Sequence, residues 1–382
     1  MDFEFDDIQI EMQDAARQFA LKRLKPLVAK MDEESHYETS LIKELAELGF
    51  FGILVPEEMG GIGIDSLSYV LIIEELSKVC PSTSVMLSVH NSLLNEMLMQ
   101  MGTDDQKKRF LKKAAEGKII GAFAITEPEA GSDAAGTKTK AVLDGDNYII
   151  NGTKTFITNA NIADVFIIFT TTKPEAKTKG ITAFFVEKET KGFSLGKKEE
   201  KMGLRASSTM ELVFIDAVVP VTNRIGNENE GFKYAMKLLD GGRIGIAAQA
   251  LGIAEAAFDE AIKYSKERKQ FGKAICEFQA IQWMLADMAT DIEAARNIVY
   301  KAAWMKDKGM PYSREASMAK LYASEMSNRV VNKALQIHGG YGYVKEFPIE
   351  RIYRDQKITQ LYEGTSEIQR MVIARSLLNP NR

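Results

Sequence analysis

Residues 281–302, IQWMLADMATDIEAARNIVYKA, carry the clearest structural pattern in the chain. Their apolar positions alternate spacings of four and three residues without a break, which is the period of one buried helix face. These positions are Ile281, Leu285, Met288, Ile292, Ala295, Val299 and Ala302. Helical periodicity in residues 243–266, 315–338 and 365–378 predicts three further helices. We therefore expect a helical bundle from residue 233 to residue 382.

Two other patterns precede this bundle. From residue 119 to residue 232, short β-branched and aromatic runs lie between turn signals, which predicts an antiparallel sheet or small barrel. The turn signals are Asp144-Gly145, Asn151-Gly152 and Lys179-Gly180. In residues 1–118 the apolar spacing is again helical, as in residues 41–48 and 69–79. The predicted fold class is therefore mostly α with a central β domain, in three domains covering residues 1–118, 119–232 and 233–382.

Composition and charge restrict the function. The chain has 382 residues, of which 45% are hydrophobic and 27% charged, as expected for a globular protein with a substantial core. Its formal net charge of −4 disfavours nucleic-acid binding, which needs a basic excess. Residues 1–7 are acidic and unlike a secretory or transit signal, and no apolar run is long enough to cross a bilayer. Cys80 and Cys276 are predicted to be free thiols in a reducing compartment, so we expect a cytoplasmic protein.

Several common catalytic signatures are absent from the sequence. The histidines, His36, His90 and His338, have no second ligand at helical spacing, which disfavours a catalytic metal site. There is neither a Gly-x-x-x-x-Gly-Lys-Ser/Thr phosphate loop nor a Gly-x-Gly-x-x-Gly after a strand. Gly-x-Ser-x-Gly is also missing. The sequence therefore gives no sign of metal, ATP, Rossmann-type NAD or serine-hydrolase chemistry.

Two loops combine glycine with polar or charged residues in an unusual way. Residues 123–133 follow a predicted strand with backbone donors and small hydroxyls, and they could bind a polar cofactor edge or form only a strand-ending turn. Residues 267–272 end a helix at glycine. There, Arg268 could meet a phosphate and Phe271 could stack on a ring. Alternatively, the basic residues only complement the dipole at the end of the helix.

A third loop, residues 358–369, carries Glu363 into a helix with Thr365 near its start. The simpler interpretation is an acidic loop residue followed by a Thr or Ser N-cap. Each of the three loops alone is weak evidence for a binding site, but their occurrence together in one chain favours a functional interpretation.

Taken together, these segments resemble the acyl-CoA dehydrogenase family over essentially the whole chain. The similar motifs are residues 125–133 (ITEPEAGSD, the flavin loop), 156–159 (FITN), 268–272 (RKQFG), 336–342 (QIHGGYG) and 362–365 (YEGT, which holds the base). Within the family, residues 239–247 (LDGGRIGIA) and 249–254 (QALGIA) are similar to the short-chain, butyryl-CoA branch.

The resemblance implies FAD held without a Rossmann fold, between the β domain and the C-terminal helices. The residues implied to bind it are Phe123, Ile125, Thr126, Gly131, Ser132, Phe156, Ile157, Thr158, Arg268, Gln270, Phe271, Phe278, Gln279, Gln336, Gly339, Gly340, Thr365 and Glu367. Arg268, Gln270 and the segments near residues 278 and 336–340 would reach the FAD of a neighbouring subunit, which implies a homotetramer built as a dimer of dimers. The residues implied to contact acyl-CoA are Ser132, Asp240, Arg243, Tyr362 and Gly364, with Asp240 and Arg243 at the CoA nucleotide end.

The resemblance also implies the reaction. Glu363 would remove the α-proton of a short-chain acyl-CoA thioester, and the β-hydrogen would leave as hydride to flavin N5, giving a trans-2-enoyl-CoA. Burial should raise the pKa of Glu363 toward the working pH. In this family the thioester oxygen is held by the backbone N–H of the base and a ribityl hydroxyl, which stabilises enolate charge. Electron-transfer flavoprotein is the implied electron acceptor, and residues 93–101 are expected near the end of the acyl chain.

Three departures from the family pattern bear on this assignment. Some branches place the base near residue 242, but Gly242 here leaves Glu363 as the candidate. Glu129 stands where glycine is commoner, and Phe156 where tryptophan is frequent. The alternatives are a dehydrogenase for longer, branched or aromatic acyl-CoA, an acyl-CoA oxidase, a flavin monooxygenase relative, and a CoA- or flavin-binding subunit without turnover. The intact Tyr-Glu-Gly-Thr motif argues against the monooxygenase.

Overall fold

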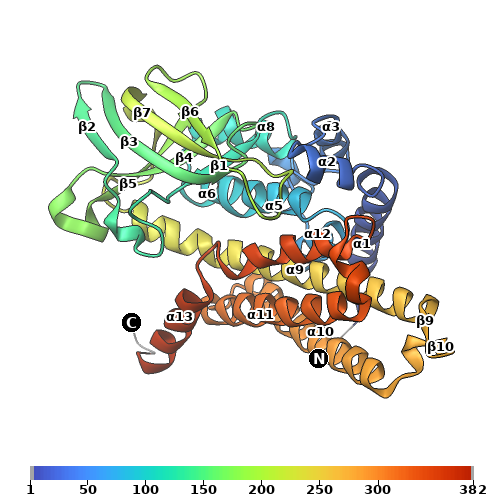
Figure 1. The fold of residues 1–382 in the computed structure, drawn as a ribbon. Helices are drawn as coiled ribbons and strands as arrows, with labels where there is room; N and C mark the ends of the chain where they lie inside the picture. Colours follow the sequence, from blue (N-terminus) through green and yellow to red (C-terminus); the bar gives the residue numbers. More distant parts are fainter. Residues whose placement is uncertain (1–3, 380–382) are drawn as a thin grey trace.

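The computed structural model describes residues 4–379 and contains three groups of elements (Figure 1). The first group is helical: α1 (Asp7–Phe19), α2 (Val28–Glu34), α3 (Ser40–Glu47), α4 (Ser66–Ser77), α5 (Pro81–Val89), α6 (Glu96–Met101), α7 (Asp104–Gln106) and α8 (Lys112–Ala115). The second is a sheet: β1 (Gly121–Ala124), β2 (Lys140–Asp144), β3 (Asn147–Thr158), β4 (Val165–Thr171), β5 (Ile181–Glu187), β6 (Phe193–Lys198), β7 (Thr209–Pro220) and β8 (Arg224–Ile225). The third comprises α9 (Gly231–Glu267), β9 (Lys269–Gln270), β10 (Lys273–Ala274), α10 (Gln279–Asp307), α11 (Ser313–His338), α12 (Ile349–Gln356) and α13 (Ser366–Leu378). The predicted fold class is confirmed.

The sheet has the strand order β6-β7-β3-β2-β4-β5-β8, and β1 pairs with β4. Most neighbours are antiparallel, as predicted, but β1 runs parallel to β4, from Gly121 opposite Val165 to Ala124 opposite Ile168. This parallel pairing was not predicted, because a strand of four residues gives too short a pattern to show its direction. It brings the chain directly from the end of β1 into residues 125–133.

The predicted turn at Asn151-Gly152 is wrong, because both residues lie inside β3. The register between β3 and β7 shifts between Ile150 and Gly152, so the pair marks a β-bulge. Gly152 has a φ of +148°, and a Cβ there would lie 2.5 Å from Thr139 Oγ1. Asn-Gly therefore supplies a bend within one long strand, where the sequence signal suggested a hairpin.

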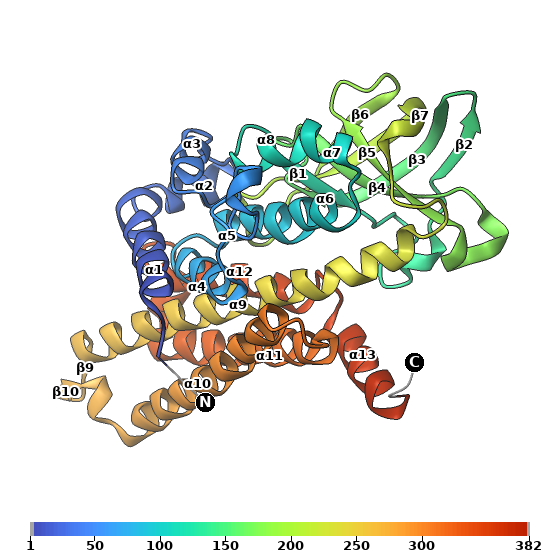
Figure 2. The same ribbon diagram turned by 180° about the vertical axis from the view of Figure 1, so that it is seen from behind.

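Helix α9 is the central element of the molecule. Its 37 residues span about 55 Å at the usual helical rise, from the sheet to the far end of the bundle (Figure 1). From behind, α4 and α5 lie against it (Figure 2). Small residues make this approach possible, since a Cβ on Gly252 would lie 2.2 Å from the backbone oxygen of Glu74. The buried stretch of α9 therefore fixes the helical groups and the sheet relative to one another.

The periodic face of α10 packs as predicted. Its last five positions, Met288 to Ala302, are buried, whereas Ile281 and Leu285 are partly buried against the same core. That core also contains side chains from α1, α4, α9 and α11, so the N-terminal helices and the bundle share one hydrophobic cluster.

The predicted end of a helix at Gly272 is wrong. Helix α9 ends at Glu267, and residues 269–274 form a small antiparallel hairpin, β9 with β10. Phe271 and Gly272 occupy its turn with φ values of +51° and +82°, the left-handed pair typical of a two-residue hairpin. The hairpin lies at the opposite end of the molecule from α13 (Figures 1 and 2).

Candidate active site

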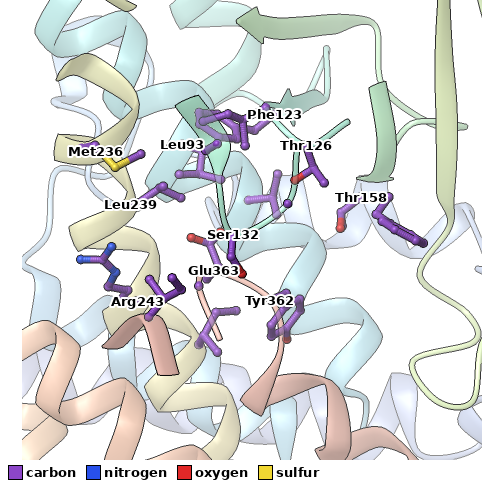
Figure 3. A pocket seen from close by; sticks show the side chains of 18 of the residues that line it. Leu93, Phe123, Thr126, Ser132, Thr158, Met236, Leu239, Arg243, Tyr362 and Glu363 are labelled. Atoms are coloured by element: carbon purple, nitrogen blue, oxygen red, sulfur yellow. The ribbon is translucent and has the colours of Figure 1, made fainter. Parts of the chain in front are cut away.

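A cavity of about 290 Å³ lies where the sheet, α9 and the loop before α13 meet. Twelve of the predicted site residues line it: Phe123, Ile125, Thr126, Gly131, Ser132, Phe156, Ile157, Thr158, Arg243, Tyr362, Glu363 and Gly364. Figure 3 shows Met236, Leu239 and Arg243 along α9 on one side and Thr158 on the other, with Glu363 between them. Segments more than 200 residues apart in the sequence are thus brought to one place.

The loop that follows β1 is held by a buried ion pair. Lys154 Nζ donates to Glu127 Oε1 at 2.7 Å, and both side chains are shielded from solvent, at 0% and 5% exposure. Glu127 also accepts the backbone N–H groups of Lys138 and Thr139 at 2.7 and 3.1 Å. The Thr155 N–H donates to the Thr126 carbonyl at 2.9 Å. These bonds fasten residues 125–130 to β3, which forms the neighbouring wall of the cavity.

The end of β3 is distorted toward the cavity. Its register against β7 shifts again between Lys154 and Ile157, and Phe156 has a φ of +58°. Such left-handed backbone is uncommon for a bulky residue and marks a functional constraint. The bulge leaves the Phe156 ring 63% exposed on the cavity wall, beside Thr158.

This wall suits a flat heterocycle with a polar edge. Thr126, Ser132 and Thr158 bring hydroxyl groups to an otherwise largely apolar surface, next to the rings of Phe123 and Phe156. A Cβ built on Gly131 would meet nothing within 4 Å, so the loop backbone also faces open space. Apolar walls with a few placed polar groups are the usual lining of a cofactor site.

The carboxylate of Glu363 closes the cavity from the side of the bundle. Its backbone has a φ of +54° and is followed by Gly364 at +90°. Lys320 Nζ donates to the Gly364 carbonyl at 2.7 Å. Gln369 Nε2 donates to the carbonyls of Glu363 and Gly364, both at 3.0 Å. The loop is therefore held in a strained conformation by side chains of α11 and α13.

Burial raises the pKa of Glu363 to about 7. Desolvation is the largest cause, and the positive charges of Arg243 and Lys320 oppose it. The Oε2 atom is buried without a hydrogen-bond partner among the described residues. A carboxylate in this environment can take up a proton near neutral pH, which is the property required of a general base.

Gly242 of α9 provides the space for this carboxylate. A Cβ on Gly242 would lie 2.7 Å from Glu363 Oε2 and 3.1 Å from its carboxyl carbon. The side chain of Glu363 therefore packs directly over a glycine, and a larger residue there would displace it.

Arg243 is the cationic residue of this cavity wall. Its side chain is 6% exposed and lines the cavity beside Glu363. Its Nη1 donates to Asp240 Oδ1 at 2.5 Å and to Ser317 Oγ at 3.3 Å. The guanidinium is thus already paired inside the protein and acts on the charge of Glu363. Asp240 lies outside the cavity lining and touches the site only through Arg243.

A second group of predicted residues lies far from the first. Arg268, Gln270, Gly339 and Gly340 line another cavity, of about 770 Å³, together with Tyr264, Ile275, Ile337, His338, Tyr341, Val344, Glu346 and Phe347. Arg268 directly follows the last residue of α9 and lies 25 positions after Arg243, which is about 37 Å along the helix axis. The two cavities of one chain therefore cannot hold the same end of one ligand.

The remaining predicted residues are absent from the lining of both cavities. Phe271 is 94% exposed in its hairpin turn, and its ring approaches that of Phe278 with centroids 6.1 Å apart. Gln279 and Gln336 are exposed and line neither cavity. Thr365 is the N-cap of α13, where its side chain accepts the Ile368 N–H at 3.4 Å, as its position predicted. Glu367 is exposed in the first turn of that helix.

Several lining residues were not predicted. They are Val85, Val89, Phe232, Met236, Leu239 and Ile246, which form the apolar wall of the first cavity together with Leu93. Of the expected segment 93–101, only Leu93 lines the cavity, because Met97 and Leu98 point into the core under the sheet. Apolar helical residues give no sequence signal that separates a cavity wall from a core.

Two of the histidines, His90 and His338, are buried and contact backbone carbonyls. Burial lowers the pKa of His90 to about 4, so this ring is neutral; it contacts the Ala114 carbonyl and accepts the Gly121 N–H. The ring of His338 contacts the Ala334 carbonyl. Within residues 4–379 there is no cluster of His, Cys, Asp or Glu suited to a metal ion. No helix in the same range is both long and apolar enough to span a membrane.

The amino-acid sequence matches three family models. They describe the acyl-CoA dehydrogenase N-terminal domain at residues 6–118, the middle domain at residues 122–217 and the C-terminal domain at residues 229–378.

Known proteins resemble the chain over its whole length. The short-chain specific acyl-CoA dehydrogenase of Clostridium acetobutylicum is 52% identical, over 98% of this chain and 99% of that protein. The structure of butyryl-CoA dehydrogenase from Megasphaera elsdenii matches with a TM-score of 0.98 and 50% identity, covering 99% of this chain and 100% of the other. A chain from the structure of the electron transferring flavoprotein of Acidaminococcus fermentans, from work on flavin-based electron bifurcation, gives 0.98 and 51% at the same coverage. The protein described here belongs to the acyl-CoA dehydrogenase family.

Proposed function

We propose that this enzyme carries out FAD-dependent α,β-dehydrogenation of a short-chain, butyryl-CoA-like acyl-CoA to the trans-2-enoyl-CoA. Glu363 takes the α-proton, and its environment supports this role. A carboxylate with a pKa of about 7 is a stronger base than one in water, and it is ionised in useful amounts at neutral pH. This buried and strained carboxylate, facing the wall formed by β3 and residues 125–132, is the observation that carries the proposal.

The cofactor assignment rests on the family and on the lining of the first cavity. Members of the family are flavoproteins. The hydroxyls of Thr126, Ser132 and Thr158 and the exposed ring of Phe156 fit the polar edge and the flat face of an isoalloxazine. When bound, FAD would supply the hydride acceptor for the β-hydrogen. The protein itself contributes the base, its orientation and a largely apolar cavity.

The apolar wall supports a short acyl chain. Residues from α5, η3 (His90–Asn95) and α9 close the cavity with aliphatic side chains, among them Val89, Leu93 and Leu239. These side chains give an unbranched alkyl group apolar contacts but no hydrogen-bond partner. We infer that the thioester lies between Glu363 and Ser132 and that the alkyl end points toward Leu93.

We further propose that electrons pass to an electron-transfer flavoprotein and that the enzyme is a homotetramer. The likeness to a chain from an electron-transferring flavoprotein structure supports the first point. The second cavity supports the homotetramer, because within one chain it lies too far from Glu363 to bind the same end of a ligand. A neighbouring subunit would bring the two together. Two free cysteines fit a cytoplasmic location.

The first experiment is an anaerobic titration of the purified protein, followed by its visible spectrum. We expect a yellow flavin that bleaches with butyryl-CoA and less readily with octanoyl-CoA. If only a longer, branched or aromatic thioester bleaches the flavin, that thioester defines the substrate class in place of butyryl-CoA. Turnover of butyryl-CoA with oxygen as the sole acceptor would favour an oxidase. A flavin that no acyl-CoA reduces would contradict the proposed reaction.

Glu363→Gln tests the base directly. The amide keeps the shape of the side chain but cannot accept the proton, so we expect unchanged flavin binding and a loss of substrate-dependent flavin reduction of several orders of magnitude. Glu187→Gln on β5 is the matched control, because its carboxylate is half-exposed and lines neither cavity. Near-normal reduction by Glu363→Gln would remove Glu363 from the mechanism.

A further inference from the structure

Lys320 is a fully buried lysine to which the sequence motifs assigned no role. It lies on α11, its side chain has 0% exposure, and its Nζ donates to the Gly364 carbonyl at 2.7 Å. Lysine is almost never completely buried unless an anion is near. Among the carboxylates that favour the charged form of Lys320, Glu363 has the largest effect, followed by Glu325 and Glu367. Burial lowers the pKa of Lys320 to about 8, so the ammonium persists at neutral pH.

Gln369 holds the same loop without a charge. From α13 its Nε2 reaches the carbonyls of both Glu363 and Gly364 at 3.0 Å. The two carbonyls therefore receive three hydrogen bonds from side chains, two of them from an amide and one from an ammonium. A non-glycine residue with a φ of +54°, as at Glu363, persists only where surrounding contacts hold it.

We propose that Lys320 is a positioning residue for the base: it fixes the strained loop through Gly364 and supplies, at neutral pH, a positive charge that favours the ionised form of Glu363. Gln369 shares the first task and has no part in the second. This inference rests on the proposed function of Glu363 as the base.

The charged and titratable groups around Glu363 support this division. Arg243 faces it from α9, Lys320 from α11, Tyr69 from α4, and Tyr362 precedes it in the loop. Arg243 is paired with Asp240, so part of its charge is compensated. Both tyrosines stay protonated, because burial raises their pKa values. The pKa of Glu363 stays at about 7 only with both cations present, so loss of the Lys320 charge must raise it.

The test compares Lys320→Met, Lys320→Gln and Gln369→Leu in the flavin-loaded enzyme. Lys333→Met is the matched control, because Lys333 lies on the same helix and pairs with Asp287 at the surface. The ionisation of Glu363 is followed by the infrared band of its protonated carboxyl, identified by its absence in Glu363→Gln. The pH profile of kcat/KM with butyryl-CoA is measured in parallel.

Loss of the Lys320 charge should shift the pH profile of kcat/KM, whereas loss of the Gln369 hydrogen bonds should not. In Lys320→Met and Lys320→Gln we expect the infrared midpoint and the acid limb to move to higher pH. A move of one pH unit lowers kcat/KM about tenfold at pH 6. Near pH 9, where Glu363 is ionised in the wild type and in the Lys320 variants, the difference in kcat/KM becomes smaller. Gln369→Leu should lower kcat at every pH with the midpoint unmoved, and Lys333→Met should match the wild type.

Two results would overturn the inference. One is an unmoved infrared midpoint in both Lys320 variants, and the other is an equal shift in Gln369→Leu. Lys320→Gln keeps a hydrogen-bond donor, so the charge can be tested even if Lys320→Met folds poorly. The infrared titration needs no substrate. A shifted midpoint in an enzyme that reduces no thioester would therefore sustain the inference and reject the proposed function.

Discussion

At the scale of single residues, Glu363 combines two features that oppose folding. Its left-handed backbone costs about 1–2 kcal/mol for a non-glycine residue. Burial raises its pKa from 4.5 to about 7. The unfolded chain therefore releases this proton at lower pH than the folded protein, and stability from this group falls as pH rises from about 4.5 to about 7. Such costs are typical of catalytic groups, where function opposes stability.

Gly242→Ala should displace the carboxylate of Glu363 without changing the cavity wall formed by β3 and residues 125–132. The new Cβ would lie 2.7 Å from Glu363 Oε2, so the carboxylate must move. A displacement of about 1 Å from the reacting atom lowers rates roughly a hundredfold, so we expect kcat to fall by that order while flavin content stays constant. Stopped-flow measurement of flavin reduction checks this.

The neighbouring glycine supplies the control. A Cβ on Gly241 would meet Lys306 Nζ at 3.6 Å, an ordinary contact, on the same helix. Gly241→Ala should keep the wild-type reduction rate, and replacing a helical glycine should add about 0.5–1 kcal/mol of stability. Equal rates in the two variants would show that the space above Gly242 is not needed by Glu363.

At the scale of elements, the site depends on the junction between β3 and residues 125–130. Two bulges bend β3, one at Gly152 and one between Lys154 and Ile157. The second turns Phe156 toward the cavity and places Lys154 beneath the loop, where it meets Glu127. Residues 125–130 contain little regular structure, so this buried pair and the Thr155–Thr126 backbone hydrogen bond hold them against the strand.

Lys154→Met should therefore destabilise the protein strongly. It leaves the Glu127 carboxylate buried without its cation, which typically costs about 3–5 kcal/mol. Lys154→Met combined with Glu127→Gln should recover part of this loss, because no charge remains unpaired. Chemical denaturation of the flavin-loaded enzyme measures both.

An exposed pair on the same loop is the comparison. Lys138 binds Glu129 at the surface, and both side chains are about 70% exposed. Exposed pairs contribute little, so Lys138→Met should leave the denaturation midpoint unchanged. A similar loss in Lys138→Met and Lys154→Met would mean that burial of the Glu127–Lys154 pair has no special importance.

At the scale of the whole molecule, α9 separates the two groups of site residues. It carries Arg243 near one cavity and ends beside Arg268 at the other, about 37 Å away. A ligand that needs both must be shared between subunits. In that arrangement each functional site takes Glu363 from one chain and Arg268 from its neighbour.

Mixed oligomers test this sharing. Glu363→Gln and Arg268→Ala should each be nearly inactive alone, the second through weaker FAD retention. Co-expression with two affinity tags, followed by purification of mixed oligomers, should recover activity, because some sites then combine an intact Glu363 with an intact Arg268. Mixed oligomers no more active than either parent would contradict sharing, and sedimentation would show whether they are tetramers.

The sequence by itself determined the elements and the chemistry of the motifs. Local patterns predicted these elements correctly: the four-and-three spacing predicted α10, and the β-branched runs predicted the sheet. The Thr365 N-cap was also predicted correctly. The motifs also predicted twelve of the residues that line the first cavity, because each motif is contiguous in the sequence. Asn151-Gly152 was misread, because one dipeptide suits either a hairpin or a bulge, and only the partner strand selects between them.

Only the tertiary structure decided which side chains share a space. Lys320 lies 43 residues from Glu363 and Gly242 lies 121 residues away, yet both border its carboxylate or its loop. No sequence pattern distinguishes a lysine buried under the Glu363 loop from one at the surface. The sequence likewise did not predict that Arg243 is buried and bonded to Asp240. Periodicity determines local structure, whereas the desolvation and charge that set the basicity of Glu363 depend on the packing of α9, α11 and α13 around it.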